Sequence, residues 1–222
     1  MVWWVWRQAC AAGAESVVIA TDDARIADVM LADGADVAMT NSNHPSGTDR
    51  LAEVAQDRGW AENSVVVNVQ GDEPLMPVQN IQQVAQELIV HPEASIATLS
   101  ERLTCVEQLD DPSVVKVVAS ASGNALYFSR AAIPFLRDRS EQSSALLLAT
   151  ARRHIGLYAY RCGFLQAYAT WPPSETEKLE SLEQLRALDQ GHTIRISDAA
   201  EPVPAGVDTP ADLERVRSLL VG

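Results

Sequence analysis

The chain contains few basic residues for its length, and this shortage limits what it can bind. Its 222 residues include 17 Lys and Arg against 30 Asp and Glu, which gives a formal net charge of −13. A protein that binds nucleic acid needs a basic face to neutralise the phosphates. The composition therefore argues against a nucleic-acid partner, although a phosphate ligand held through a metal and a few local Arg or Lys is compatible with it.

Cysteine is also scarce, and long apolar runs are missing. The three cysteines, Cys10, Cys105 and Cys162, are scattered and fall in no metal-ligand spacing. Such a set predicts reduced thiols in a cytoplasmic protein. No apolar run is long enough to span a bilayer, so we expect no membrane partner. The four histidines show no paired metal spacing either.

The chain does contain a regular alternation of apolar strand and helix patterns. Between residues 1 and 110, helices are predicted at 1–12, 24–32, 49–58 and 77–90, and strands at 17–20, 37–39, 65–69 and 96–99. This alternation is typical of a mostly parallel, doubly wound α/β sheet. It predicts a nucleotide-binding α/β part over residues 1–110.

The pattern changes after residue 110. Strands at 114–119 and 125–129 flank a Ser-Gly-Asn turn and predict an antiparallel hairpin. The polar stretch 133–149 is predicted as a loop, 154–161 as a strand, 164–171 as a short helix and 175–188 as one long helix. A strand at 193–197 and a last helix opening near residue 208 follow. We therefore divide the remainder into a hairpin region at 111–175 and a C-terminal part at 176–222 that returns to the main sheet.

The stretch 65–74, VVVNVQGDEP, is the most informative. Four valines in five residues are typical of a strand buried on both faces. Polar and acidic residues then follow at the carboxyl end, where ligands bind in open α/β sheets. Asp72 could hold a cation, and a cation there could neutralise phosphate. The alternative is an ordinary strand exit with solvated acids.

Three further groups are candidates, each with a plainer alternative. Asp208, in GVDTP, could share a cation with Asp72 or simply cap the last helix. The HPSGTDR stretch at 44–50 could bind an anion or a base edge through backbone N–H groups at a helix start. The alternative is an ordinary loop that caps the helix. The last group could bind a substrate carboxylate, or its members could simply be charged side chains in contact with water. It comprises Arg130, Arg152, Arg153, His154, Tyr158, Glu183 and Gln184.

Together these residues give a clear resemblance to one family. The chain resembles the 3-deoxy-manno-octulosonate cytidylyltransferases, or CMP-Kdo synthetases. The matching stretches occur in family order and span nearly the whole chain. They are IATDD (19–23), HPSGTDRLAEV (44–54), VVVNVQGDEPL (65–75), PSVVKVV (112–118), ALYFSRAAIP (125–134), RRHIGLYAYR (152–161), ESLEQLRAL (180–188) and GVDTPADLERVR (206–217).

The resemblance implies a nucleotidyltransferase fold of the nucleotide-diphospho-sugar transferase type, and a cytoplasmic homodimer that acts in lipopolysaccharide biosynthesis. The implied reaction joins CTP and Kdo to give CMP-Kdo and pyrophosphate, with Mg2+ as cofactor. Asp72 and Asp208 are then the catalytic, metal-holding pair. Nucleotide-binding residues are Ser46, Gly47 and Arg50. The sugar acid is expected to meet Gln70, Arg130, His154, Tyr158, Glu183 and Gln184.

The sequence departs from the family in two places. The family opens with a strand and a loop rich in Ala, Arg, Ser, Gly and Lys that wraps the CTP phosphates, and residue 1 here matches a point inside the family's first helix. We therefore expect an incomplete nucleotide-binding part. Residues 138–153 also deviate from the family pattern. Two alternatives stay open, namely a cytidylyltransferase for another sugar acid, or a weak or inactive truncated relic.

Overall fold

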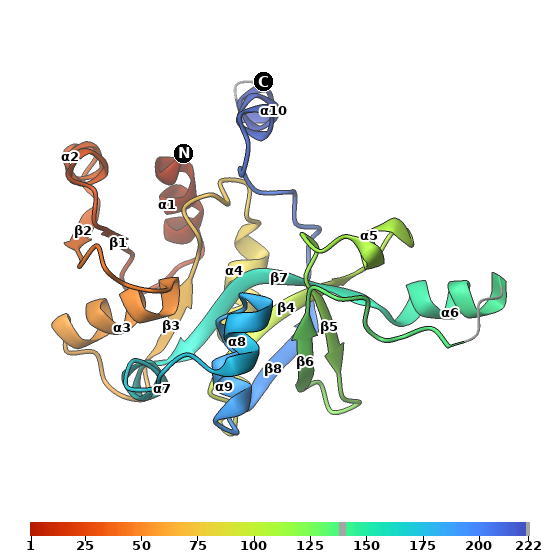
Figure 1. Cartoon of the computed structure of the whole chain (residues 1–222). Helices are drawn as coiled ribbons and strands as arrows, with labels where there is room; N and C mark the ends of the chain where they lie inside the picture. The colour runs from red at the N-terminus through yellow and green to blue at the C-terminus, as the bar shows by residue number, and fades with distance from the viewer. Residues whose placement is uncertain (138–140, 221–222) are drawn as a thin grey trace.

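The computed structural model describes residues 1–137 and 141–220. Helices and strands alternate along the chain as Figure 1 shows. The helices are α1 (Val2–Ala11), α2 (Ala24–Ala32), α3 (Gly47–Asp57), α4 (Val78–Val90), α5 (Glu107–Asp110), α6 (Glu141–Thr150), α7 (Cys162–Tyr168), α8 (Glu175–Glu180), α9 (Gln184–Asp189) and α10 (Pro210–Leu220). The strands are β1 (Val18–Thr21), β2 (Asp36–Met39), β3 (Val65–Asn68), β4 (Ile96–Arg102), β5 (Lys116–Ala119), β6 (Ala125–Ser129), β7 (Arg152–Arg161) and β8 (Ile194–Asp198).

The long strand β7 organises the main sheet. It pairs antiparallel with β3, β4 and β5, while β4 pairs parallel with β8 and β5 forms the predicted hairpin with β6. The predicted α/β class is therefore correct, but the main sheet is mixed rather than mostly parallel. The reason is that β7 enters the sheet between strands that run the other way.

Side chains of β7 alternate between two packed layers, as the period of two in a strand requires. Tyr158 and Tyr160 pack on one face with α3, α7 and α9, whereas Leu157 and Ala159 pack on the other face with α4. The core therefore lies on both sides of the main sheet. None of the described helices is long and apolar enough to cross a bilayer.

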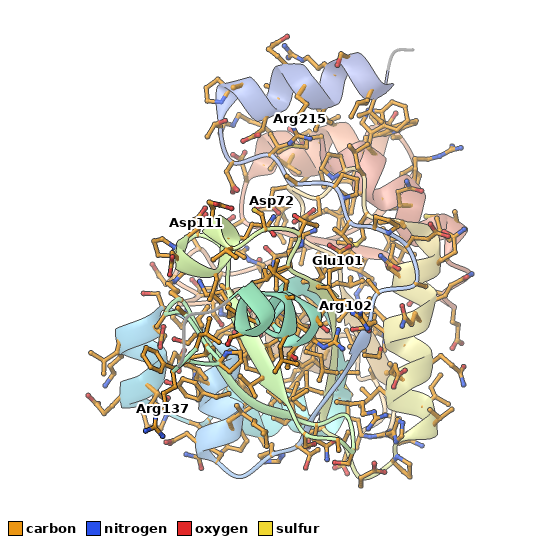
Figure 2. All side chains as sticks on the ribbon, turned by 90° about the vertical axis from the view of Figure 1, so that its right-hand side faces the viewer. Asp72, Glu101, Arg102, Asp111, Arg137 and Arg215 are labelled. Carbon is orange, nitrogen blue, oxygen red and sulfur yellow. The ribbon has the colours of Figure 1, made fainter. Side chains whose placement is uncertain are left out.

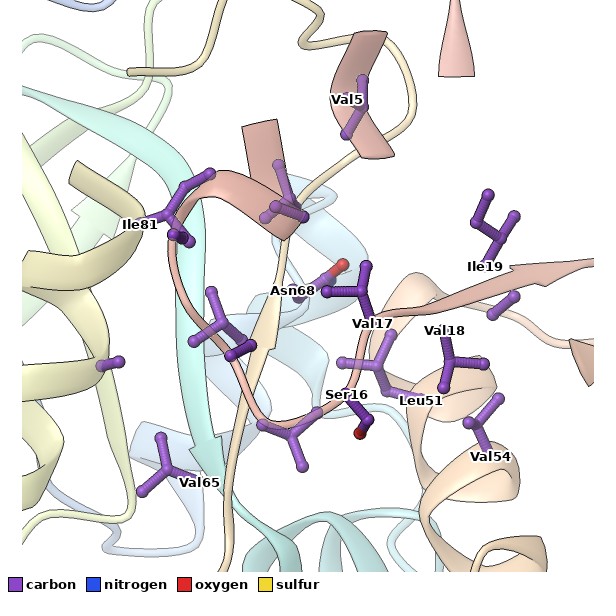
Figure 3. Close-up of a pocket in the computed structure, with 18 of the residues that line it drawn as sticks. Val5, Ser16, Val17, Val18, Ile19, Leu51, Val54, Val65, Asn68 and Ile81 are labelled. Carbon is purple, nitrogen blue, oxygen red and sulfur yellow. The ribbon is translucent and has the colours of Figure 1, made fainter. Parts of the chain in front are cut away.

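Strand β3 differs most from its expected environment. Its valine run predicts burial on both faces, yet all four residues of the strand are only partly buried, and in the described chain it pairs with β7 alone. Strands β1 and β2 form a separate parallel pair. A cavity of about 1030 Å³ lies between β1 and β3, and α1, α3 and α4 complete its walls. Figure 3 shows Val18 and Ile19 on one side of this cavity and Val65 on another.

Two further predictions were wrong. The expected long helix 175–188 is two short helices, because Ser181 ends α8 in a left-handed conformation with φ of 53°. The capping box of Ser174 and Glu177 fixes the start of α8. The polar stretch 133–149, predicted as a loop, contains α6, while residues 138–140 of that prediction lie outside the described chain.

Candidate active site

The turn after β3 and the segment before α10 meet at one place. The Val207 amide donates a 2.9 Å hydrogen bond to the carbonyl oxygen of Asp72, and the Glu73 amide donates to the Gln70 carbonyl at 3.1 Å. A Cβ at Gly206 would lie 3.0 Å from Oε1 of Glu73. Glycine therefore favours this close approach of the two segments. Asp72 and Asp208, which lie 136 positions apart, are therefore carried by segments in direct contact.

Three carboxylates gather here, and the pKa of Glu73 responds to them. Burial of the carboxyl, together with the negative charges of Asp72 and Asp208, raises the pKa of Glu73 to about 7, while Arg153 acts in the opposite direction. The negative potential at this turn favours a cation. Glu73 was not among the predicted site residues, although it directly follows Asp72 in the sequence.

The start of α3 forms a second part of the site. Ser46 is the N-cap residue, and its hydroxyl accepts from the Asp49 amide at 3.2 Å. Arg50 lies one turn further on, 3.4 Å from Oδ1 of Asp22, and donates to the Thr40 hydroxyl. Gly47 and Arg50 both line the large cavity. The first turn of α3 therefore places Gly47 and the cation of Arg50 beside the cavity, while the amides of Thr48 and Asp49 are bonded to Glu183 and Ser46.

Aromatic and imidazole rings form a third part, on β7. The His154 ring lies 5.2 Å from that of Tyr158, and its Nε2 is 2.9 Å from the Thr98 hydroxyl. Burial of the ring lowers the pKa of His154 to about 3, so His154 is neutral near pH 7. Burial and the nearby Glu183 raise the pKa of Tyr158, so its hydroxyl stays protonated.

Two glutamine residues and Glu183 connect these parts. Gln70 donates to the Gly156 carbonyl at 3.1 Å, and Oε2 of Glu183 accepts from the Thr48 amide at 3.3 Å. Gln184 is buried, and its Nε2 has no hydrogen-bond partner among the described residues. A buried donor without a partner is costly, so a ligand acceptor at this point would stabilise the site.

The cavity brings several predicted residues together. Gly47, Arg50, Gln70, Asp72 and Glu183 share its wall. His154 and Tyr158 lie beside each other on β7. Arg130 is engaged elsewhere, because its guanidinium donates to the carbonyls of Glu180 at 2.8 Å and Pro112 at 2.9 Å.

Comparison with known proteins identifies the family. A family model described as Cytidylyltransferase matches residues 1–194. The 3-deoxy-manno-octulosonate cytidylyltransferase of Pseudomonas syringae pv. syringae (strain B728a) is 54% identical over 224 residues, covering 100% of this chain and 88% of that protein. Its counterpart in Acinetobacter baumannii (strain AYE) is 51% identical over 209 residues, covering 94% of this chain and 83% of the relative.

This chain belongs to the 3-deoxy-manno-octulosonate cytidylyltransferase family. A solved structure of CMP:2-keto-3-deoxy-manno-octonic acid synthetase complexed with CTP superposes with a TM-score of 0.89 at 38% identity. The match covers 99% of this chain and 87% of that one. The nucleotide-diphospho-sugar transferase type of fold is thereby confirmed.

The donor set of the synthetase site suits Mg2+. This hard cation takes oxygen ligands and is usually held by one or two carboxylates, with water and substrate phosphate completing the octahedron. Asp72 and Asp208 supply that number, and the charges of both add to the effect of burial that raises the pKa of Glu73. No cluster of three or more His, Cys, Asp or Glu able to hold a metal occurs among the described residues. Asp72 and Asp208, on two segments in contact, are the residues that would hold such a cation.

Sequence reasoning missed contacts that depend on strand register. Glu101 and Arg153 are directly opposite each other in the β4–β7 pairing, and both contact the segment that leads to Asp208. Arg153 was noted as part of a charged group, but Glu101 was not singled out. The two residues are 52 positions apart, and no sequence pattern indicates that they face each other on neighbouring strands.

Proposed function

We propose that this protein transfers a cytidylyl group from CTP to 3-deoxy-D-manno-octulosonate, giving CMP-Kdo and pyrophosphate. The anomeric hydroxyl of the sugar acid attacks the α-phosphorus of CTP, a new P–O bond forms, and pyrophosphate leaves. The observation that carries this proposal is the contact between the Asp72 turn and the Val207 backbone, which unites the two acids at the end of β3. The reaction supplies a nucleotide-activated sugar acid for lipopolysaccharide biosynthesis.

The predicted site residues fall into three groups, which hold the cation, the nucleotide and the sugar acid. Asp72 and Asp208 hold Mg2+, which supplies positive charge against the phosphates when bound. The first turn of α3, with Ser46, Gly47 and Arg50, binds the cytidine part, since Gly47 and Arg50 line the cavity.

The sugar acid occupies the region of β7 and α9. Neutral His154 and protonated Tyr158 present uncharged groups to hydroxyls of the sugar. Gln184 offers its unpaired Nε2 as a donor, and Gln70 and Glu183 lie at the cavity wall. Arg130 binds the carboxylate, for which it must give up its hydrogen bond to Pro112 or Glu180. A site that forms a hydrogen bond with each hydroxyl of the sugar acid discriminates against sugars that lack one of those hydroxyls.

The decisive experiment is Kdo-dependent release of pyrophosphate from CTP and Mg2+ by the 222-residue chain. Asp72→Ala is expected to abolish release, and Asp57→Asn, at the exposed end of α3, is the control that should retain it. Release with an acylneuraminate but not with Kdo would favour the alternative sugar-acid substrate. A folded protein that releases no pyrophosphate with either sugar acid would identify this chain as an inactive relative.

We further propose that the protein acts in the cytoplasm as a homodimer. The expectation of a homodimer follows from the family resemblance. Sedimentation equilibrium measures the assembly directly, and a mass equal to that of one chain at micromolar concentration would contradict the dimer.

A further inference from the structure

The segment that carries Asp208 has little regular structure of its own. Residues 202–208 lie between β8 and α10 and form no helix or strand. Most of this segment is exposed, but Val203 is 8% exposed and packs in the core cluster under α4. Something other than secondary structure must therefore fix the position of Asp208 relative to Asp72.

An ion pair on the main sheet holds this segment by its backbone. Nε and Nη2 of Arg153 donate to Oε2 of Glu101 at 2.8 and 2.6 Å. The same Nη2 donates to the Val203 carbonyl at 2.7 Å, and the Val203 amide donates to Oε1 of Glu101 at 2.6 Å. The pair thus offers one donor and one acceptor to a single residue, as a neighbouring strand would.

Arg215 of α10 holds the same segment from the other side. Its Nη2 donates to the carbonyls of Ala205 at 3.0 Å and Gly206 at 3.1 Å. Figure 2 shows Arg215 beneath α10, with Asp72 and Glu101 labelled on the face below it. Directly after these two anchors in the chain, the Val207 amide bonds to the Asp72 carbonyl oxygen.

We propose that Glu101 and Arg153 are positioning residues that hold the Val203 backbone, and thereby keep the Asp208 carboxylate beside Asp72. The proposal rests on the proposed function in one respect, the use of Asp72 and Asp208 as a cation-binding pair. Glu101 and Arg153 act through the backbone of residues 203–207 and need not contact the cation or the substrates.

Arginine is required at position 153 for a geometric reason. Its planar group donates to the carboxylate through two nitrogens while one of them also reaches the Val203 carbonyl. A lysine ammonium is a single point and cannot reproduce that fork. Arg153→Lys should therefore keep the charge and lose part of the positioning.

The chain offers a closely matched control in Arg195 of β8. Arg195 also pairs with a partly buried glutamate, Glu87, and also donates to a backbone carbonyl, that of Ser122. The side chains of this pair are 19% and 21% exposed, against 28% and 21% for Arg153 and Glu101. Arg195→Gln therefore removes a similar ion pair whose backbone contact, the Ser122 carbonyl, lies in the turn between β5 and β6 and not in the Asp208 segment.

The test combines a MnCl2 titration by calorimetry with amide hydrogen exchange of residues 203–208. Arg153→Gln and Glu101→Gln are each expected to weaken Mn2+ binding about tenfold, the lower end of the range for residues that orient metal ligands. Exchange of the Val203 and Val207 amides should accelerate in both variants. Arg153→Lys should fall between wild type and Arg153→Gln. Arg195→Gln should match wild type in both measurements.

Other results of these two measurements would separate the positioning role from the cation site itself. Wild-type Mn2+ affinity and exchange in Arg153→Gln would overturn the positioning role. Asp208→Asn should abolish Mn2+ binding while leaving exchange at Val203 unchanged. If the wild-type chain binds no Mn2+, the proposed cation site is wrong. The comparison of amide exchange rates between Arg153→Gln and Arg195→Gln then decides by itself whether the ion pair positions the segment.

Discussion

The Val207 amide and the Asp72 carbonyl oxygen are 2.9 Å apart, and this hydrogen bond joins the two segments that carry the acids of the site. The preceding residue, Gly206, is tightly enclosed, since a Cβ there would lie 3.0 Å from Oε1 of Glu73 and 3.2 Å from the Asp72 carbonyl. A side chain at position 206 would therefore press against the two groups that face it.

Gly206→Ala should separate the two segments. We expect faster exchange of the Val207 amide and weaker cation binding, because the new methyl group pushes the backbone of residues 205–207 away from Asp72. Gly71→Ala is the control, since a Cβ at Gly71 meets nothing within 4 Å. Unchanged Val207 exchange in Gly206→Ala would show that the loop adapts without loss of the bond.

The buried ion pair of Arg186 and Glu177 should dominate the stability of the α8–α9 region. Arg186 is 2% exposed, donates to both Glu177 oxygens at 2.8 and 2.5 Å, and lies 4.2 Å from the centre of the Tyr168 ring. Arg186→Met should cost about 3–5 kcal/mol in urea unfolding, because it leaves the carboxylates of Glu177 and Asp49, with side chains 12% and 11% exposed, without their cation.

An exposed pair provides the comparison for that measurement. Arg217 and Glu214 form an ion pair on α10 with side chains 62% and 70% exposed. Arg217→Met should therefore change the unfolding free energy by less than about 1 kcal/mol. Equal losses for Arg186→Met and Arg217→Met would mean that burial of the Arg186 pair contributes nothing.

His154 should make stability depend on pH. Its pKa is about 3 in the folded chain, against its usual 6.5, because burial disfavours the charged ring. Below pH 6.5 the unfolded chain binds a proton that the folded chain does not. The contribution of His154 to the free energy of unfolding is therefore present above pH 6.5 and is lost as the pH falls toward 3, by about 1.4 kcal/mol per pH unit.

The His154→Gln variant isolates this contribution. Glutamine does not titrate, so the difference in unfolding free energy between wild type and His154→Gln should change with pH between 6.5 and 4. Urea unfolding at several pH values measures that difference directly. A difference independent of pH across this range would mean that His154 has an ordinary pKa in the folded chain.

The free edge of β3 should be visible in amide exchange. Strand β4 has a neighbour on both sides, whereas β3 pairs with β7 on one side and borders the cavity on the other. We expect the β3 amides that do not bond to β7 to exchange far faster than those of β4, because open backbone groups are accessible to water. Equal protection in the two strands would mean that the cavity is closed in solution.

Much of the fold could be read from residue patterns, because local rules produce them. The apolar periods of α2, α3 and α4 and the hairpin of β5 and β6 were predicted to within a few residues. The break at Ser181 could not be predicted, since the leucines on either side continue the helical period, although Ser181 takes a left-handed conformation and Glu183 contacts the start of α3. Helix α6 was missed because its sequence lacks a clear amphipathic pattern.

The sequence by itself determined the family, the α/β class and the acids at the end of β3, because long motifs and strand patterns are local properties of the chain. Only the tertiary structure decided which strand lies against β7, that β3 has an open edge, and that Glu101 and Arg153 hold the Asp208 segment. These relationships arise from strand register and from contacts between residues far apart in the chain, such as Asp72 and Val207, which no local rule encodes.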